Sequence, residues 1–227
     1  QNLFSDLNDL GVPASESMRF SDNAEQMGLG QVALDYVGWG TAFLDFDLDT
    51  RLDLIISNGH TLSAPDLPEK MSPMQPQIFW NAGIERGFFD VSPVSGEALG
   101  RWMVGRGLAV GDYDNDGDPD ALFVAHGEPC LLLRNDQDTG NSWLKVRLHG
   151  RGQNCHGVGA RVTLVAGTKR QIRESTAGSS YCSQHAAGEI LFGLGGSASV
   201  DSLVIRWPLG DRQVLTDIGI NQTVGAE

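Results

Sequence analysis

The sequence predicts an all-β protein in which partial β-propeller blades are followed by a small β-sandwich-like domain. Short runs of β-branched and aromatic residues alternate with Gly, Asp, Asn and Pro, the pattern of strands joined by turns. Helix signals are scarce; one short exception is Ser21–Leu29, where Ser21 or Asp22 is placed to cap a turn or two. A segment of several strands also recurs with a period of more than about 40 residues, which is typical of propeller blades.

Seven segments carry the strand pattern: LDLIISNG, PQIFWNAG, DALFVAHG, WLKVRLHG, ARVTLVAG, KRQIREST and LVIRWPLG. Between the first two lies the proline-rich segment Ala64–Pro76, which we expect to be a long loop between strands of neighbouring blades. The aspartate-rich pattern ends at Asn135–Asn141. We therefore place a domain boundary near Asn141, with the blades in residues 1–141 and the second β domain in residues 142–227.

The repeat is visible residue by residue. GWGTAFLDFDLDTRLDLIIS (Gly38–Ser57) aligns without a gap with GRGLAVGDYDNDGDPDALFV (Gly105–Val124). The alignment sets one series of aspartates opposite the other: Asp45, Asp47, Asp49 and Asp53 against Asp112, Asp114, Asp116 and Asp120. A second element of the repeat, Gln77–Ser92, echoes Asn2–Ala24.

The second aspartate loop suits a hard divalent cation. Carboxylates gathered this closely repel one another, and Ca²⁺ removes the conflict by taking 6–8 oxygen ligands. We expect side-chain ligands from Asp112, Asp114 and Asp116, a sharp turn at Gly117, and a further ligand from Asp120 at the start of the next strand. Asp118 would offer its backbone carbonyl while its side chain faces water. Mg²⁺ fits less well because it demands a tighter octahedron.

The first loop has the same carboxylates at Asp45, Asp47, Asp49 and Asp53, and Arg51 takes the carbonyl position. It departs at Thr50, where the second loop has Gly117, because a β-branched residue resists positive φ. This site is expected to bind calcium more weakly or to be vestigial. The alternative for either loop is an acidic turn in solvent; two such loops in register favour calcium.

Composition excludes several classes of function. The 227 residues include 16 Lys+Arg and 29 Asp+Glu, a formal net charge of -13. Nucleic acid and anionic membranes are disfavoured because both attract basic surfaces, and no apolar run reaches the roughly 20 residues of a spanning helix. The five histidines lack metal spacing, and no nucleophile elbow, phosphate loop or dinucleotide fingerprint is present. We do not expect an enzyme.

The repeated segments resemble the FG-GAP/VCBS repeats of integrin-type β-propellers. The remainder resembles the ASPIC/UnbV domain, through GVGARV, SYCSQ, FGLG, VDSLVIRWPLG and NQTV. In combination the chain is similar to the cartilage acidic protein family. That resemblance implies a secreted or cell-surface protein that is stabilised by Ca²⁺ and acts through interactions.

The chain departs from this pattern in two ways. Closed propellers have 4–8 blades, whereas this chain holds about two and a half; it is a fragment, an open partial propeller, or a subunit that completes its sheets by association. Cysteines stand at Cys155 and Cys182, which either pair in a disulfide or remain buried thiols. Cys130 is expected to be buried and free.

The leading hypothesis is a non-enzymatic, extracellular or cell-surface calcium-binding protein. Its expected roles are adhesion, binding to a matrix protein or polysaccharide, or self-assembly into a homo-oligomer or filament. The alternative is a polysaccharide-active enzyme, or an accessory to one, that uses the C-terminal domain as a carbohydrate-binding module.

Overall fold

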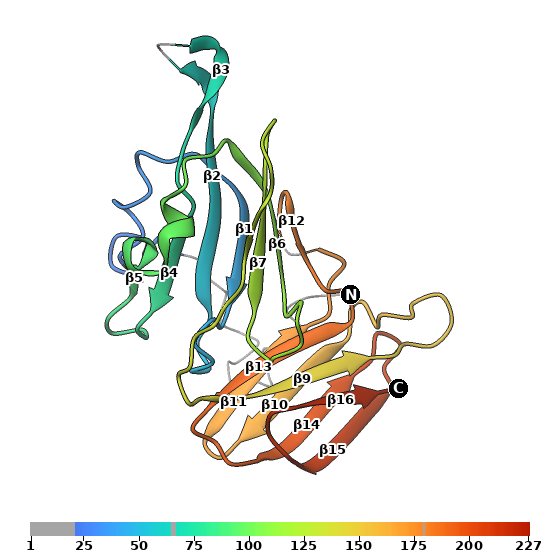
Figure 1. Ribbon diagram of the computed structural model, residues 1–227. Coiled ribbons are helices and arrows are strands. Elements are labelled where there is room, and N and C mark those ends of the chain that lie inside the picture. Colours follow the sequence, from blue (N-terminus) through green and yellow to red (C-terminus); the bar gives the residue numbers. More distant parts are fainter. Residues whose placement is uncertain (1–20, 65–66, 179) are drawn as a thin grey trace.

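The computed structural model describes residues 21–64, 67–178 and 180–227, and these form four β-sheets (Figure 1). Helical structure in these ranges is limited to two short 3-10 turns, η2 (Ser92–Val94) and η3 (Glu97–Gly100). No helix among them is long and apolar enough to cross a membrane. The predicted all-β class is confirmed, whereas the short helix expected within Ser21–Leu29 is only a series of turns.

The first blade is an antiparallel sheet in the order β1-β2-β4-β5. Its strands are β1 (Gly38–Leu44), β2 (Asp53–Ala64), β4 (Gln77–Asn81) and β5 (Phe88–Asp90). The segment Ala64–Pro76 was expected to be a loop, and this is wrong: Leu67–Pro73 forms strand β3, which pairs with β2. A strand at the edge of a sheet tolerates proline, because its outward N–H groups need no partner.

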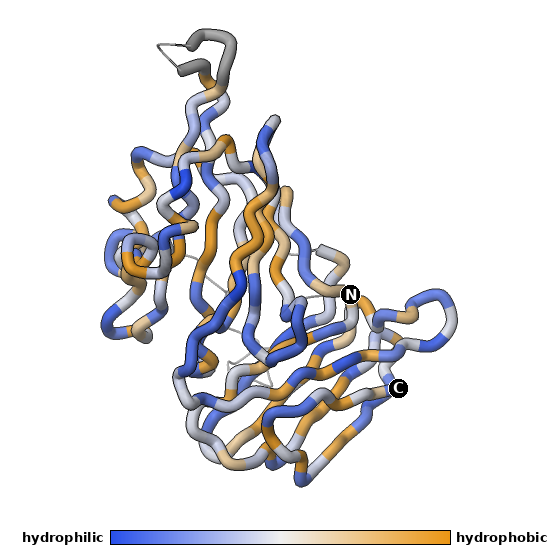
Figure 2. Tube along the Cα trace, viewed as in Figure 1, coloured by the Kyte–Doolittle hydropathy of each residue, from blue (hydrophilic) through white to orange (hydrophobic). Residues whose placement is uncertain are grey.

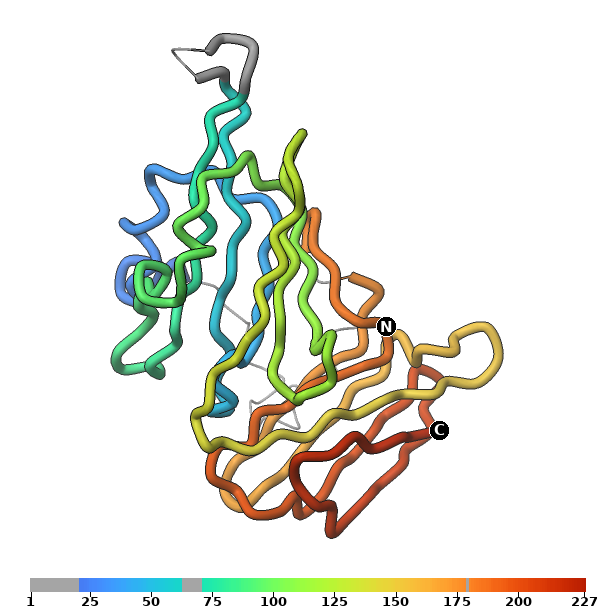
Figure 3. The backbone as a smooth tube through the Cα atoms, viewed as in Figure 1, coloured from blue at the N-terminus to red at the C-terminus, as the bar shows by residue number. Residues whose placement is uncertain are grey.

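The second blade contains a strand from the C-terminal half of the chain. It has the order β12-β6-β7-β8, from β6 (Gly105–Gly111), β7 (Asp120–Ala125), β8 (Leu131–Leu133) and β12 (Ser183–His185). β12 runs parallel to β6, and the tube in Figure 3 shows this orange segment beside the green one. Ser183 Oγ also accepts a hydrogen bond of 2.7 Å from the Thr41 backbone N–H in the first blade. The two halves of the chain are therefore interlocked.

The blades pack face to face over an apolar core. It comprises buried residues of both sheets and Met103, which precedes β6: Ala42, Leu44, Ile55, Met103, Leu108, Ala121, Phe123 and Ala125. In Figure 2 these strands carry the orange of hydrophobic residues along their length. Because side chains alternate across a strand, each blade presents one apolar face to the other. The equivalent of the repeat in residues 2–20 lies outside the described residues.

The C-terminal half forms two sheets around a second core. One has the order β11-β10-β14-β15, the other β13-β9-β16. The strands are β9 (Ser142–Leu148), β10 (Arg161–Ala166), β11 (Lys169–Glu174), β13 (Glu189–Gly195), β14 (Val200–Arg206), β15 (Arg212–Ile218) and β16 (Gln222–Ala226). Leu144, Val162, Phe192 and Leu203 are 0% exposed in this core. The two-sheet architecture agrees with the expected β-sandwich-like fold.

The aspartate loops lie where the blades meet the C-terminal sheets (Figure 1). One connects β1 to β2 and the other connects β6 to β7. The Gly195 N–H at the end of β13 donates to the Leu48 carbonyl of the first loop over 2.8 Å. Both loops are thus held between two parts of the fold.

Candidate metal centres

The two aspartate loops have the same strand register at their bases. Leu44 pairs with Asp53 in the first blade, and Gly111 pairs with Asp120 in the second. The last aspartate of each series therefore begins the returning strand, and the preceding ones lie in the loop. The alignment of the two repeats is confirmed by this common geometry.

Each loop brings its first three aspartates together. In the groups Asp45, Asp47, Asp49 and Asp112, Asp114, Asp116, one ligand atom per residue lies within 4.8 Å of the others. The first aspartate of each group is buried: Asp45 is 6% exposed, and the side chain of Asp112 is 2% exposed. Oδ1 of each is buried without a hydrogen-bond partner. A buried carboxylate oxygen without a partner is costly, and a bound cation would satisfy it.

Asp53 and Asp120 are not in these groups of three, and their carboxylates accept hydrogen bonds from the loop backbone and from a neighbouring segment. Asp53 accepts backbone N–H groups from Phe46 (3.1 Å) and Asn81 (2.7 Å). Asp120 accepts the equivalent pair, from Tyr113 (2.9 Å) and Asn135 (2.9 Å). Each carboxylate thus ties the start of its loop to a neighbouring segment. The sequence predicted both residues as metal ligands, and no local pattern in it indicates these backbone contacts.

The turn position has positive φ in both loops. Gly117 has φ 101° and Thr50 has φ 88°. Each then donates its backbone N–H to the first aspartate, Thr50 to Asp45 Oδ2 (2.9 Å) and Gly117 to Asp112 Oδ2 (3.1 Å). The first loop therefore keeps the geometry of the second despite its threonine. The difference appears as backbone strain at Thr50, of about 1–3 kcal/mol for such a conformation.

Replacing Thr50 with glycine should stabilise the protein. Relief of the strain exceeds the entropic cost of a glycine, so we expect a gain of about 1 kcal/mol in unfolding free energy. Urea denaturation measures it. Thr50→Ala, which keeps the Cβ atom, is the matched control and should gain less unfolding free energy than Thr50→Gly. Equal gains in the two variants would mean that the φ angle is not the source of the strain.

Burial makes several loop carboxylates hard to ionise in the metal-free protein. Desolvation raises the pKa of Asp45 to about 7 and that of Asp53 to about 8, and neighbouring aspartates add to both. In the second loop, burial and the charges of Asp116 and Asp112 raise the pKa of Asp118 to about 6. The Asp118 side chain, expected to face water, is partly buried.

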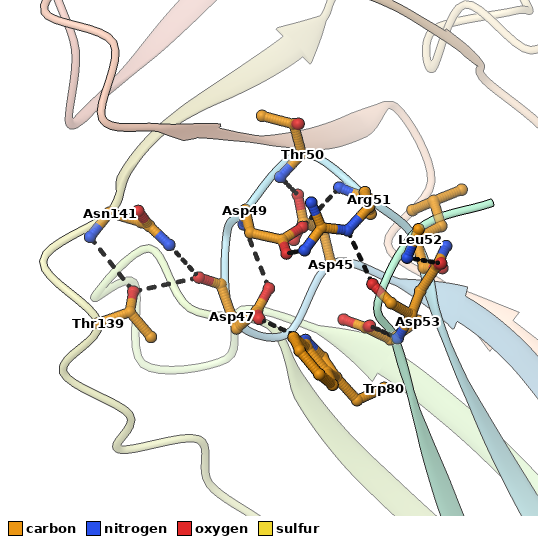
Figure 4. A network of polar contacts seen from close by, with 12 residues as sticks. Asp45, Asp47, Asp49, Thr50, Arg51, Leu52, Asp53, Trp80, Thr139 and Asn141 are labelled. Atoms are coloured by element: carbon orange, nitrogen blue, oxygen red, sulfur yellow. Dashed lines mark hydrogen bonds and ion pairs between the residues drawn. The ribbon is translucent and has the colours of Figure 1, made fainter. Parts of the chain in front are cut away.

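Neighbouring side chains fix the shape of the first loop (Figure 4). The Trp80 indole N–H donates to Asp47 Oδ2 over 2.8 Å, and the Asn141 amide donates to the Asp47 carbonyl over 2.8 Å. Arg51 pairs with Asp49 and donates from Nε to the Asn81 carbonyl over 2.7 Å. The sequence predicted a role for the Arg51 carbonyl and not for its side chain. No local motif indicates these contacts, because their partners lie on other strands.

The C-terminal sheet β13-β9-β16 packs against both loops. Trp143 of β9 lies against Gly117, where a Cβ atom would overlap the indole ring. Lys145 of β9 forms an ion pair with Asp112. Gly193 of β13 lies under the first loop, where a Cβ atom would overlap Asp45 and the backbone of Leu48. The alternation of Leu144, Lys145 and Val146 predicts that the Lys145 side chain points away from the C-terminal core. Nothing in the sequence identifies its partner.

The cysteines do not pair. Cys130, Cys155 and Cys182 are all free and exposed. Of the alternatives for Cys155 and Cys182, neither the disulfide nor the pair of buried thiols is formed; both lie in exposed turns, Cys182 directly before β12. The expected burial of Cys130 is also wrong, because the short strand β8 begins only after it.

The fold and these loops together define a class: an all-β protein with two aspartate clusters that could hold metal ions. Residues 45–123 match the FG-GAP-like repeat family, and residues 150–227 match the family described as ASPIC and UnbV. The chain therefore combines an FG-GAP-like repeat with a C-terminal ASPIC/UnbV domain, which confirms the resemblance drawn from the sequence. A comparison with curated proteins gave no match.

Proposed function

We propose that this protein is a non-enzymatic, extracellular or cell-surface calcium-binding protein in which bound Ca²⁺ stabilises the folded structure. The observation that carries the proposal is the buried, unpartnered Oδ1 atom of Asp45 and of Asp112, one in each cluster. Carboxylate and carbonyl oxygens are the donors that Ca²⁺ prefers. Asp45, Asp47 and Asp49 would hold one ion, and Asp112, Asp114 and Asp116 a second.

The position of the loops explains what the metal would stabilise. Each loop lies between a blade and the C-terminal sheet, so a loop ordered by metal favours docking of these parts. A ligand that binds only the folded state stabilises it by mass action. Extracellular fluid is rich in Ca²⁺, and even a site of modest affinity would be filled there. This supports a structural use of the carboxylates as ligands of a bound ion.

Calcium should raise the melting temperature, and Asp114→Ala should remove part of that rise. Asp114 forms no hydrogen bond or ion pair within the described part of the chain, so its loss removes a metal ligand and little else. For two sites at 100-fold excess over the dissociation constant, we expect a stabilisation of about 5 kcal/mol and a rise of roughly 10–20 °C. Thermal unfolding of metal-stripped protein, with Ca²⁺ and with EDTA, measures it.

Asp138→Ala is the matched control for that experiment. Asp138 is an exposed aspartate in the segment after β8, outside both loops, and its loss should leave the calcium-dependent rise unchanged. The proposal fails if the stripped wild-type protein shows no rise and binds no calcium by equilibrium dialysis. If calcium raises the melting temperature of wild type and of Asp114→Ala equally, the second loop is not a calcium site.

The partner would be a protein or polysaccharide surface, or further copies of the chain. Support comes from the high net negative charge, which disfavours nucleic acid, and from the short blades, whose sheet edges can pair with other chains. Secretion or display at the cell surface is part of the same proposal, because that is where calcium is abundant.

A second candidate function is carbohydrate binding by the C-terminal domain, as in an enzyme or enzyme accessory that acts on polysaccharides. A cavity of about 680 Å³ there is lined by Trp207 together with Arg151 and Arg212. Neither arginine has a partner within the described residues, and guanidinium groups suit carboxylate or sulfate. Screening glycans with and without acidic groups, with Arg212→Ala as the loss-of-binding variant, separates this candidate from a purely structural domain.

A further inference from the structure

The second aspartate loop already contains a buried cation that belongs to the protein. Lys145 extends from β9 to Asp112, and both side chains are 2% exposed. Its Nζ atom also lies 3.4 Å from Asn115 Oδ1 of the same loop. The charge is contributed by the C-terminal domain and not by the blade that carries the loop.

The strand geometry holds this lysine in the loop. Leu144 and Val146 are 0% exposed in the C-terminal core, so the residues between and beside them project from the opposite face of β9. On that face Trp143 lies against Gly117, which fixes the loop to the strand next to Lys145. The ammonium group of Lys145 therefore lies at Asp112 whenever the second blade and the C-terminal domain are in contact.

Among the residues that the structure describes, no lysine or arginine forms an equivalent ion pair with Asp45. The residue under Asp45 is Gly193, which has no side chain, and a Cβ atom there would overlap the carboxylate. Arg173 acts on Asp45 only at longer range, and its guanidinium donates to the Ile172 carbonyl and to Gln171 Oε1. The cation that does pair within this loop is Arg51, which contacts Asp49; its side chain is 41% exposed, so its charge is screened by solvent more than that of Lys145.

We propose that Lys145 is an internal competitor that lowers the calcium affinity of the second loop, so that the first loop fills at lower calcium concentration. This rests on the proposed calcium function. Charges in a buried pair are poorly screened, so an ammonium group on Asp112 opposes the entry of a divalent cation at the same carboxylate. A cavity of about 240 Å³, lined by Asp45, Asp112 and Lys145, gives the displaced side chain room.

The proposal reverses the order of affinities expected from the sequence. The sequence favours the second loop because it has Gly117 at the turn, where the first loop has Thr50. The structure gives both residues a positive φ, so the strain at Thr50 is already part of the fold that would receive the ion. That strain lowers the stability of the protein but has little effect on calcium affinity. The buried charge of Lys145 acts on affinity directly.

Calcium titration of metal-stripped protein by calorimetry tests the proposal. Wild type should show two classes of site, and Asp114→Ala should remove the weaker one. Lys145→Met, which keeps a long apolar stem without the charge, should strengthen the weaker site at least about tenfold. Arg147→Gln is the matched control: Arg147 lies two residues further along β9 and pairs with Glu189 instead of a loop aspartate, so its loss should leave both affinities unchanged.

Thermal unfolding separates competition from a purely structural role. Without calcium, Lys145→Met leaves Asp112 buried and unpaired, so its melting temperature should fall below that of wild type. With calcium the difference should shrink, which makes the calcium-induced rise larger in the variant. Lys145→Arg keeps the charge and should keep the weak site.

Two results would overturn the proposal in different ways. If wild type binds two calcium ions and Lys145→Met binds the second no more tightly, Lys145 is only a structural partner of Asp112, and the calcium function stands. If stripped wild type binds no calcium at either loop, the calcium function itself fails and the competition fails with it.

Discussion

Replacing Gly117 with alanine should destabilise the protein by about 3 kcal/mol, the cost of overpacking a buried contact on top of a strained backbone. Gly117 has φ 101°, and a Cβ atom there would overlap the indole of Trp143. The loop would have to move away from β9, and the contact between the second blade and the C-terminal domain would open. A fall of roughly 6–12 °C in melting temperature is expected for a chain of this size.

Gly127→Ala isolates the part of this effect that comes from the contact. Gly127 also has positive φ, 70°, but no atom lies within 4 Å of where its Cβ would be. Gly127→Ala should therefore lose only the unfolding free energy that a non-glycine residue costs at positive φ, about 1 kcal/mol. Urea denaturation of both variants at saturating calcium gives the comparison. If the two variants lose the same stability, the packing of the second loop on Trp143 contributes nothing.

This contrast shows what could be predicted from the sequence. The repeat, the seven strand segments and the grouping of three aspartates in each loop all follow from short-range patterns: alternation, turn residues and spacing. The contact of Gly117 with Trp143 depends on how β9 lies under the blades, which no local pattern encodes. Tertiary contacts also explain why Thr50 takes a conformation that its side chain disfavours.

The roles of Asp53 and Asp120 illustrate the same limit. In sequence they look like further members of an acidic series. In the structure both of their oxygens accept backbone N–H groups from segments that precede and follow them. Spacing reveals that a carboxylate is near the loop, but only the fold decides whether its oxygens face the centre or the neighbouring backbone.

β12 is the element that sequence reasoning had least chance of finding. It is three residues long and pairs in parallel with β6, far away in the chain. A strand this short has no periodicity to detect, and its partner lies across the expected domain boundary near Asn141. The physical cause is the exposed edge of β6, whose backbone groups need a partner.

The metal-free protein should lose stability as the pH rises from 5 to 8. Asp45 and Asp53 have folded-state pKa values of about 7 and about 8, well above the roughly 3.9 of an unfolded chain. Each group therefore contributes stability that is fully present below the unfolded pKa and is lost as the pH rises through the folded one. At pH 5 the unfolded state has already released these protons, whereas the folded state ionises its buried carboxylates only between pH 5 and pH 8.

The expected loss is about 2–4 kcal/mol, less than the sum of the separate shifts, because the aspartates of one loop share their repulsion. Urea denaturation of stripped protein at pH 5 and pH 8 measures it. Asp45→Asn, which cannot ionise, should reduce the pH dependence. A stripped protein that is equally stable at both pH values would contradict the burial of these carboxylates.

Calcium should reverse that dependence. The ion binds the ionised carboxylates, so its affinity rises as protons leave Asp45, and the stabilisation by mass action grows over the same pH interval in which the metal-free fold weakens. At saturating calcium the unfolding free energy should be nearly flat or should rise from pH 5 to pH 8. The difference between the curves with and without calcium is then largest at pH 8. A protein that depends on its metal most strongly at neutral and alkaline pH uses the ion to stabilise carboxylates whose ionisation is costly in the metal-free fold.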